Sequence, residues 1–215
     1  MLELVDIRIA TPERTLVRGL SAQVGPGQVL AVMGESGAGK SSLLAWLCGT
    51  LAAELTASGD VRLDGRDIGT LPTVQRRIGI LFQDDLLFPH LSVTENLLFA
   101  LPAGAAAERR ARAEDALERA DLAGFGPRLP HTLSGGQRAR VSVLRTLLAK
   151  PRALLLDEPF SRLDTALRGR FRSFVFERLR EEGIPAVLVT HDVHDVPHGA
   201  QVLWLTPVDA ERVDV

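Results

Sequence analysis

The stretch that decides the fold of this chain is Val29-Leu30-Ala31-Val32-Met33-Gly34-Glu35-Ser36-Gly37-Ala38-Gly39-Lys40-Ser41. Its first five residues are apolar, which is typical of a buried strand. Its second half satisfies the pattern G-x-x-x-x-G-K-[ST], and the apolar, glycine-free run that follows, up to Cys48, favours a helix. A strand, a glycine-rich turn and a helix in this order predict a P-loop, which holds phosphate groups.

The residues of the turn suit phosphate chemistry. Glycines let successive backbone N–H groups point at phosphate oxygens, and the helix N-terminus adds partial positive charge. We expect Lys40, one of only two lysines in the chain, to neutralise the β- and γ-phosphates and the Ser41 hydroxyl to hold Mg²⁺. An ordinary glycine-rich turn is the alternative, but the motif arises by chance in about one such sequence in 650. The expected nucleotide contacts are Gly34, Glu35, Ser36, Gly37, Ala38, Gly39, Lys40, Ser41 and Ser42.

An acidic pair follows a second aliphatic run. Asp157 and Glu158 come directly after Leu154-Leu155-Leu156, and α/β sheets carry their ligand chemistry at the carboxyl ends of strands. We expect Asp157 to hold Mg²⁺ through its water shell and Glu158 to act as the general base on an attacking water. A surface acidic pair is the alternative, and only the accompanying P-loop disfavours it.

Composition bounds the class of protein. The 215 residues, 46% hydrophobic and 24% charged, predict one ordinary globular domain. The 25 basic and 27 acidic side chains leave a net charge of −2, which disfavours nucleic acid as a partner. Apolar runs such as Leu97 to Leu101 fall far short of the roughly 18 residues that span a bilayer. Cys48 is the only cysteine, which excludes an internal disulfide and a cysteine-based zinc cluster and fits a reducing cytoplasm.

The remaining pattern predicts an α/β fold. The early part has strand-like runs and a hairpin signal at Asp64-Gly65. Residues 153–156 and 186–189 are continuous aliphatic runs, typical of strands buried in a parallel sheet, and 165–182 favours the crossover helix between them. We therefore expect a mostly parallel core sheet, an N-terminal antiparallel β region and an inserted helical part.

The inserted part is the segment 92–122. Glu108 and Arg112, like Asp115 and Arg119, stand four residues apart on an alanine-rich background, which is typical of solvated helices. The basic run 109–112 could indicate nucleic-acid binding, but the interleaved acidic residues favour a solvated face, to which we assign no function.

A second anion-binding pattern is Leu133-Ser134-Gly135-Gly136-Gln137, which stands at the start of a predicted helix from Gln137 to Leu148. With this run the chain resembles, over nearly its whole length, the nucleotide-binding subunit of ATP-binding-cassette (ABC) transporters, whose signature sequence it matches. Gln83 matches the Q-loop glutamine, Asp164 lies in a matching D-loop, and His191 matches the switch histidine.

The resemblance implies a P-loop NTPase of the ABC type. It implies a single ABC domain over 1–215, in which 1–83 and 150–215 form the nucleotide-binding core and 84–149 form a helical subdomain that carries the signature. It also implies a sandwich homodimer that holds two ATP molecules, each between the P-loop of one chain and the signature of the other.

The resemblance further implies a role for each matching residue. Gln83 would contact Mg²⁺ and the attacking water, His191 would hold the γ-phosphate and Glu158, and Asp164 would link the two sites. The reaction would be phosphoryl transfer to water without a covalent intermediate. The signature residues that would contact the ATP of the partner are Ser134, Gly135, Gly136 and Gln137.

Two further patterns qualify this picture. His191, His194 and His198 have a spacing that suggests a metal site on a helix, but Pro197 disfavours a helix there. The family stacks adenine on an aromatic residue near Ile9 to Thr11, and this chain has none before Trp46. We therefore expect the base to contribute little to nucleotide affinity.

The predicted function is that of the ATP-hydrolysing subunit of a bacterial solute importer. Within the family, the runs 92–96 and 157–161 look most like those of importers. This implies a separate membrane permease, indirectly a periplasmic solute-binding protein, and a peripheral location on the cytoplasmic face of the cell membrane. An ABC ATPase of an exporter, a lipoprotein-release complex or a cell-division complex is the alternative. A non-catalytic nucleotide-binding scaffold is disfavoured by the intact Glu158.

Overall fold

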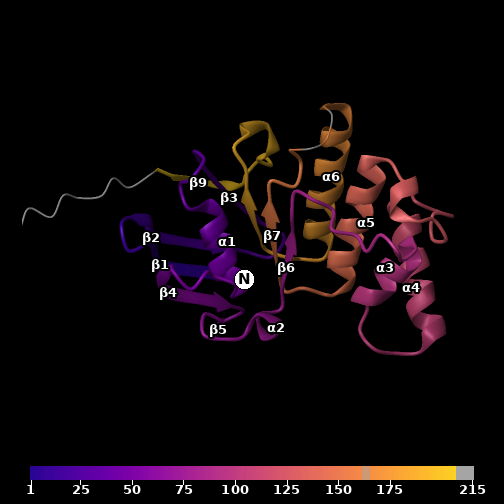
Figure 1. Cartoon of the computed structure of the whole chain (residues 1–215), viewed down its shortest axis with the longest axis horizontal. Helices are drawn as coiled ribbons and strands as arrows, with labels where there is room; N and C mark the ends of the chain where they lie inside the picture. Colours follow the sequence, from indigo (N-terminus) through magenta and orange to yellow (C-terminus); the bar gives the residue numbers. More distant parts are fainter. Residues whose placement is uncertain (162, 164, 207–215) are drawn as a thin grey trace, which may run out of the picture. The chain divides into compact units, whose positions relative to one another are not determined.

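The computed structural model describes residues 1–161, 163 and 165–206, so the predicted D-loop residue Asp164 lies outside the described residues. The chain forms two compact units (Figure 1). The first comprises Met1–Ile80, Arg152–Glu158 and the chain from Leu179 onward, and the second comprises Leu81–Pro151 and Pro159–Arg178. Residues 159–178, which the sequence-based boundaries placed with the core, group with the second unit.

The first unit begins with an antiparallel sheet. Its strands are β1 (Leu2–Ala10), β2 (Thr15–Val24), β4 (Thr56–Leu63) and β5 (Arg66–Asp67), in the order β2-β1-β4-β5. The hairpin between β4 and β5 turns at Asp64 and Gly65, both of which have positive φ, as the Asp-Gly signal predicts.

A second sheet carries the P-loop. Its order is β6-β7-β8-β3-β9, with β3 at Val29–Gly34, β6 at Ile78–Leu81, β7 at Ala153–Asp157, β8 at Ala186–Val189 and β9 at Gln201–Leu205. The pairs β7–β8, β3–β8 and β3–β9 are parallel, which confirms the predicted α/β fold. The register pairs Val189 with both Val32 and Asp157, so the carboxyl ends of β3, β7 and β8 meet at one edge.

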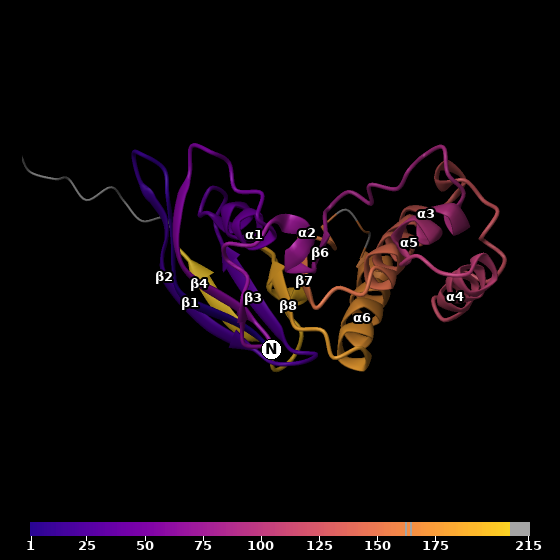
Figure 2. The ribbon, with the colours of Figure 1, turned by 90° about the horizontal axis from the view of Figure 1, so that it is seen from below.

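Helix α1 (Lys40–Cys48) packs against both sheets. Leu43, Leu44 and Leu47 share one core with side chains of β1, β2, β3, β7 and β8. Figure 2 shows α1 beside β3. Arg76, the last residue of the short helix α2 (Thr73–Arg76), is buried and holds the carboxyl end of α1, donating to the carbonyls of Trp46 and Leu47. Desolvation lowers the pKa of Arg76, and these carbonyl contacts compensate for the burial of its charge.

The second unit is helical. It contains α3 (Val93–Ala100), α4 (Ala106–Glu118), the 3₁₀ turn η1 (Pro130–Thr132), α5 (Gly135–Leu148) and most of α6 (Thr165–Glu181). The predicted segment 92–122 is thus two helices, because the stretch between them contains Pro102 and Gly104, which disfavour a helix. The predicted Asp115–Arg119 pair forms, at 3.1 Å. None of the helices in the described part of the chain is long and apolar enough to cross a bilayer.

Candidate active site

The P-loop joins β3 to α1 at the carboxyl edge of the parallel sheet. Gly34, Gly37 and Gly39 have φ values of 152°, 82° and 90°, which favour glycine at all three positions. A Cβ on Gly34 would lie 2.3 Å from the carbonyl oxygen of Leu205, and one on Gly39 would lie 3.0 Å from Leu16 Cβ. The loop therefore has its glycines where the backbone turns and where neighbouring strands come close.

Lys40 is the first residue of α1 and is buried. Its Nζ donates to the carbonyl oxygens of Gly34 and Glu35, both at 2.7 Å. The ammonium is thereby held against the loop whose N–H groups are predicted to bind phosphate. An anionic phosphate can replace these carbonyls as the acceptor, because charge-assisted hydrogen bonds are stronger than neutral ones. Ser41, in the first turn of the same helix, is exposed.

Asp157 and Glu158 stand at the end of β7 in the same unit. Burial raises the pKa of Asp157, the neighbouring Glu158 raises it further, and Lys40 opposes both effects. The negative charge of the Asp157 carboxylate is therefore not fully balanced by Lys40, and a bound cation would stabilise it. The oxygen donors of Asp157 and Ser41 are those that Mg²⁺ prefers, so the residues present fit a magnesium ion.

Glu158 has the left-handed φ of 45°, a strained conformation for a residue other than glycine. Its Oε1 lies 3.1 Å from Nδ1 of His191, whose side chain is 63% exposed. The structure thus brings together the predicted general base and the predicted switch histidine.

Thr190 fixes the segment that carries His191. Its hydroxyl is buried, donates to Asp195 Oδ2 at 3.1 Å and accepts from the backbone N–H of Asp192 at 3.1 Å. The residues that follow form only the short 3₁₀ turn η2 (Val193–Asp195), so His194 and His198 do not share a helix with His191. Within the described ranges no group of three or more His, Cys, Asp or Glu side chains is placed to hold a metal ion.

The signature run lies in the second unit, at the start of α5. Ser134 caps the helix by accepting from the Gln137 N–H, and the Gln137 side chain accepts from the Ser134 N–H at 2.9 Å. This capping box explains why the helix begins at Gly135, two residues before the predicted start. A Cβ on Gly136 would lie 2.1 Å from Cδ2 of Leu167, so a larger residue here would displace the Leu167 side chain of α6.

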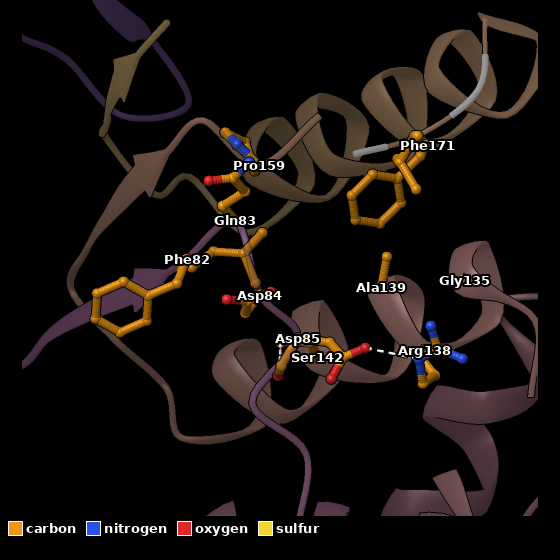
Figure 3. A pocket seen from close by; sticks show the side chains of 12 residues that line it. Phe82, Gln83, Asp84, Asp85, Gly135, Arg138, Ala139, Ser142, Pro159 and Phe171 are labelled. Carbon is orange, nitrogen blue, oxygen red and sulfur yellow. Dashed lines mark hydrogen bonds and ion pairs between the residues drawn. The ribbon is translucent and has the colours of Figure 1, made fainter. Parts of the chain in front are cut away.

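Gln83 also belongs to the second unit and is exposed. It lines a cavity of about 130 Å³ between the segment that follows β6 and the amino-terminal half of α5. Figure 3 shows Gln83, Asp84 and Asp85 on one side of this cavity and Gly135, Arg138 and Ala139 on the other.

Sequence reasoning missed Arg14. In the turn between β1 and β2, the Thr11 hydroxyl accepts from the N–H groups of Glu13 and Arg14. The Arg14 guanidinium lies 3.9 Å from the position of a Cβ on Gly37, beside the P-loop. No motif marks Arg14, and the only signal in the sequence is its place beside the segment where the family keeps its aromatic residue.

The protein-family model for ABC transporters matches residues 17–161, which is more than half of the chain. The chain belongs to the ABC transporter family. This ABC protein is 51% identical over 204 residues to the uncharacterized ABC transporter ATP-binding protein YnjD of Escherichia coli K12, covering 94% of both chains. It is 42% identical over 180 residues to the Fe(3+) ions import ATP-binding protein FbpC of Agrobacterium fabrum, and 41% identical over 178 residues to the sulfate/thiosulfate import ATP-binding protein CysA of Gloeobacter violaceus. It spans about half the length of these two relatives.

A solved structure of the same family is similar over the whole cassette. The dimeric post-hydrolysis state of the ATP-binding cassette MJ0796, bound to ADP and Pi, matches with a TM-score of 0.78 and 28% identity over 96% of both chains. The predictions of an ABC-type P-loop fold and of an ATPase are thereby confirmed. The chain is an ABC ATP-binding subunit and an ATPase.

Proposed function

We propose that this ATPase hydrolyses MgATP at the edge formed by the P-loop, the end of β7 and His191, and that the hydrolysis powers a separate membrane permease for solute uptake. The observation that carries the proposal is the 3.1 Å contact between Glu158 and His191 in the unit that also holds Lys40 against the P-loop. A base and a residue that orients it, next to a phosphate cradle, form the arrangement that hydrolysis of a phosphoanhydride needs.

Each group has a distinct task in this proposal. The N–H groups of residues 34–42 and the Lys40 ammonium bind the phosphates. Glu158 accepts a proton from the attacking water, whose oxygen bonds to the γ-phosphorus while the bond to the ADP oxygen breaks, and His191 orients Glu158. Ser41, Asp157 and Gln83 would hold Mg²⁺, which would neutralise the negative charge that develops on the phosphates during the reaction.

The signature completes the site from a second copy. Ser134 and Gly135 are exposed at the N-terminus of α5, where backbone N–H groups suit an anion. We place Ser134, Gly135, Gly136 and Gln137 on the ATP of the partner copy, with Asp164 linking the two sites. The dimeric state of the similar MJ0796 cassette supports this assignment. In the proposed single ABC domain, 1–83 and 150–215 serve the nucleotide and 84–149 carries the signature.

The uptake role is supported by the names of two relatives, FbpC and CysA, which are import ATP-binding proteins. The proposal therefore includes a permease, a periplasmic solute-binding protein that acts through it, and a peripheral position on the cytoplasmic face of the cell membrane. The alternative roles, in an exporter, a lipoprotein-release complex or a cell-division complex, predict a different partner or the opposite direction of transport.

The test uses Glu158→Gln, which keeps the shape of the side chain and removes the base. We expect steady-state hydrolysis to fall about 10³-fold while MgATP stays bound and gel filtration shows an ATP-dependent dimer. The same variant, purified from membranes with its permease and placed in liposomes, should abolish ATP-driven uptake. Hydrolysis at the wild-type rate contradicts the role of Glu158, and ATP-driven movement in the opposite direction contradicts the importer.

A further inference from the structure

The segment that follows Gln83 is fastened to the signature helix α5 at several points. Arg138 Nε donates to Asp85 Oδ2 at 2.8 Å (Figure 3), and the Ser142 hydroxyl donates to the backbone oxygen of Asp85 at 2.8 Å. Arg145 donates to the carbonyls of Asp85 and Leu86 at 3.1 and 2.7 Å. Three successive turns of one helix thus hold two consecutive residues of the segment.

These contacts hold a strained backbone. Leu86 has a φ of 46°, in the left-handed region that a leucine rarely adopts. Such a conformation is strained and persists only where surrounding contacts fix it. The Arg145 contact on the Leu86 carbonyl lies at that residue. The shape of the segment therefore depends on α5 rather than on the local preference of its own sequence.

Arg138 contacts one residue of the signature run and one residue close to Gln83. While its Nε holds Asp85, its Nη1 donates to the Leu133 carbonyl at 2.9 Å. Asp85 stands two residues after Gln83, and Leu133 immediately precedes Ser134. Because consecutive Cα atoms are 3.8 Å apart, Gln83 can lie no more than about 8 Å from the held residue. One guanidinium thus limits the distance between the Q-loop glutamine and the signature serine.

Asp85, where the segment is held, is less exposed than Gln83. Asp85 and Arg138 are about one-third exposed, so their ion pair is partly shielded from water. Gln83 is exposed and borders the 130 Å³ cavity. The small Ala139 side chain forms part of the opposite wall of the cavity (Figure 3).

We propose that Arg138, through Asp85 and the Leu133 carbonyl, is a positioning residue that makes Gln83 and the signature motif move as one body during ATP hydrolysis. This inference rests on the proposed roles of Gln83 and Ser134. Arg138 acts on the reaction only through these two motifs. It should therefore set the rate of turnover without contributing to the binding of MgATP by the P-loop.

The helix offers a matched control. Arg140, two residues further along α5, forms an ion pair with Asp121 at 3.3 Å and donates to the Ala120 carbonyl. Like Arg138, Arg140 pairs with an aspartate and donates to a backbone carbonyl of another segment. Unlike the partner Asp85 of Arg138, the partners of Arg140 do not lie close to Gln83 in the sequence. Loss of helix charge or stability alone should therefore affect Arg140→Ala and Arg138→Ala alike.

The experiment measures kcat, the KM for MgATP and the melting temperature of the full chain. Arg138→Ala and Asp85→Ala should each lower kcat about tenfold with KM unchanged within twofold, and the double variant should be no worse than either one. Arg138→Lys, which keeps the charge but loses the forked geometry, should recover part of the loss. Arg140→Ala should keep the wild-type kcat.

Three results would overturn the proposal. These are a wild-type kcat in Arg138→Ala, additive losses in the double variant, or an equal loss in Arg140→Ala. Gln83→Ala separates this inference from the proposed function. If Gln83→Ala loses turnover and Arg138→Ala does not, only the positioning role fails. If Gln83→Ala turns over normally, the proposed role of Gln83 fails and the positioning role fails with it.

Discussion

Replacing Gly34 by alanine tests whether the P-loop depends on its contact with the edge strand β9. The new Cβ would lie 2.3 Å from the Leu205 carbonyl oxygen, about 1 Å closer than the tightest ordinary contacts. Leu205 pairs with Gly34 in the parallel register. The new Cβ therefore meets a backbone oxygen, and no side-chain rotation can relieve this contact. Either β9 moves away or the start of the P-loop shifts.

The cost has two parts. The φ of 152° adds about 1–3 kcal/mol of strain for an alanine. The overlap adds about 1–3 kcal/mol, the usual effect of inserting a methyl group into a packed site. A total near 4 kcal/mol is a large share of the roughly 5–15 kcal/mol that stabilises a protein domain. Gly37→Ala is the control, because it has a φ of 82° but no atom nearer than Arg14 Nη2 at 3.9 Å. It should cost only about 1–2 kcal/mol.

The assay is urea unfolding of the nucleotide-free protein, followed by tryptophan fluorescence. Both tryptophans of the chain, Trp46 and Trp204, lie in the unit that carries the P-loop, so the signal reports on that unit. With a slope of about 2 kcal/mol/M, the midpoint should fall by about 2 M for Gly34→Ala and by less than about 1 M for Gly37→Ala. Equal shifts for the two variants would refute the crowding argument.

Two further predictions concern charge at the site. Burial and Glu158 raise the pKa of Asp157 in the folded chain above the ordinary aspartate value of 3.8. As the pH rises, the Asp157 side chain therefore loses its proton in the unfolded chain first. The folded state loses stability over this pH range and does not regain it at neutral pH. Asp157→Asn should therefore stabilise the protein in EDTA at pH 7 by about 1 kcal/mol in urea unfolding while abolishing Mg²⁺-dependent hydrolysis, and a less stable variant would contradict the pKa direction. Arg14→Ala should weaken ATP and GTP binding by the same factor of about ten in fluorescent-nucleotide titrations, because Arg14 lies beside the P-loop and the sequence has no aromatic residue before Trp46 to stack the base. A wild-type preference for ATP over GTP above about a hundredfold, or 2.7 kcal/mol, would show that another residue recognises adenine.

The sequence predicted those parts of the site whose signals are local. The strand and turn of the P-loop, the aliphatic runs of β7 and β8, and the pair Asp157–Glu158 are contiguous patterns, and the structure has these strands where they were predicted. Parallel pairing then brings Glu158 and His191 together, although they lie on different strand ends.

The features that the sequence did not predict depend on distant contacts or on weak patterns. Strand β9 was missed because it is a short edge strand with Trp204 67% exposed, so its apolar residues do not form a buried run. The pairing of Asp85 with Arg138 joins residues far apart in the chain, and neither belongs to a motif. Arg14 became a candidate only when the fold placed its turn beside Gly37.

The central claim is that each ATP lies between the Lys40 of one copy and the Ser134 of another. Homodimers of Lys40→Ala and of Ser134→Arg carry a defect at both sites. A tethered dimer with one variant in each half would have one site with two defects and one intact site. It should therefore occlude one ATP, where the wild-type tether occludes two.

The measurement is the number of occluded nucleotides per tethered dimer, which does not depend on whether hydrolysis needs both sites filled. If both motifs served one nucleotide within a single chain, each half would carry one defect and mixing would restore nothing. One ATP per mixed dimer is the predicted result. No occluded ATP in the mixed dimer, with two in the wild-type tether, would contradict the shared site.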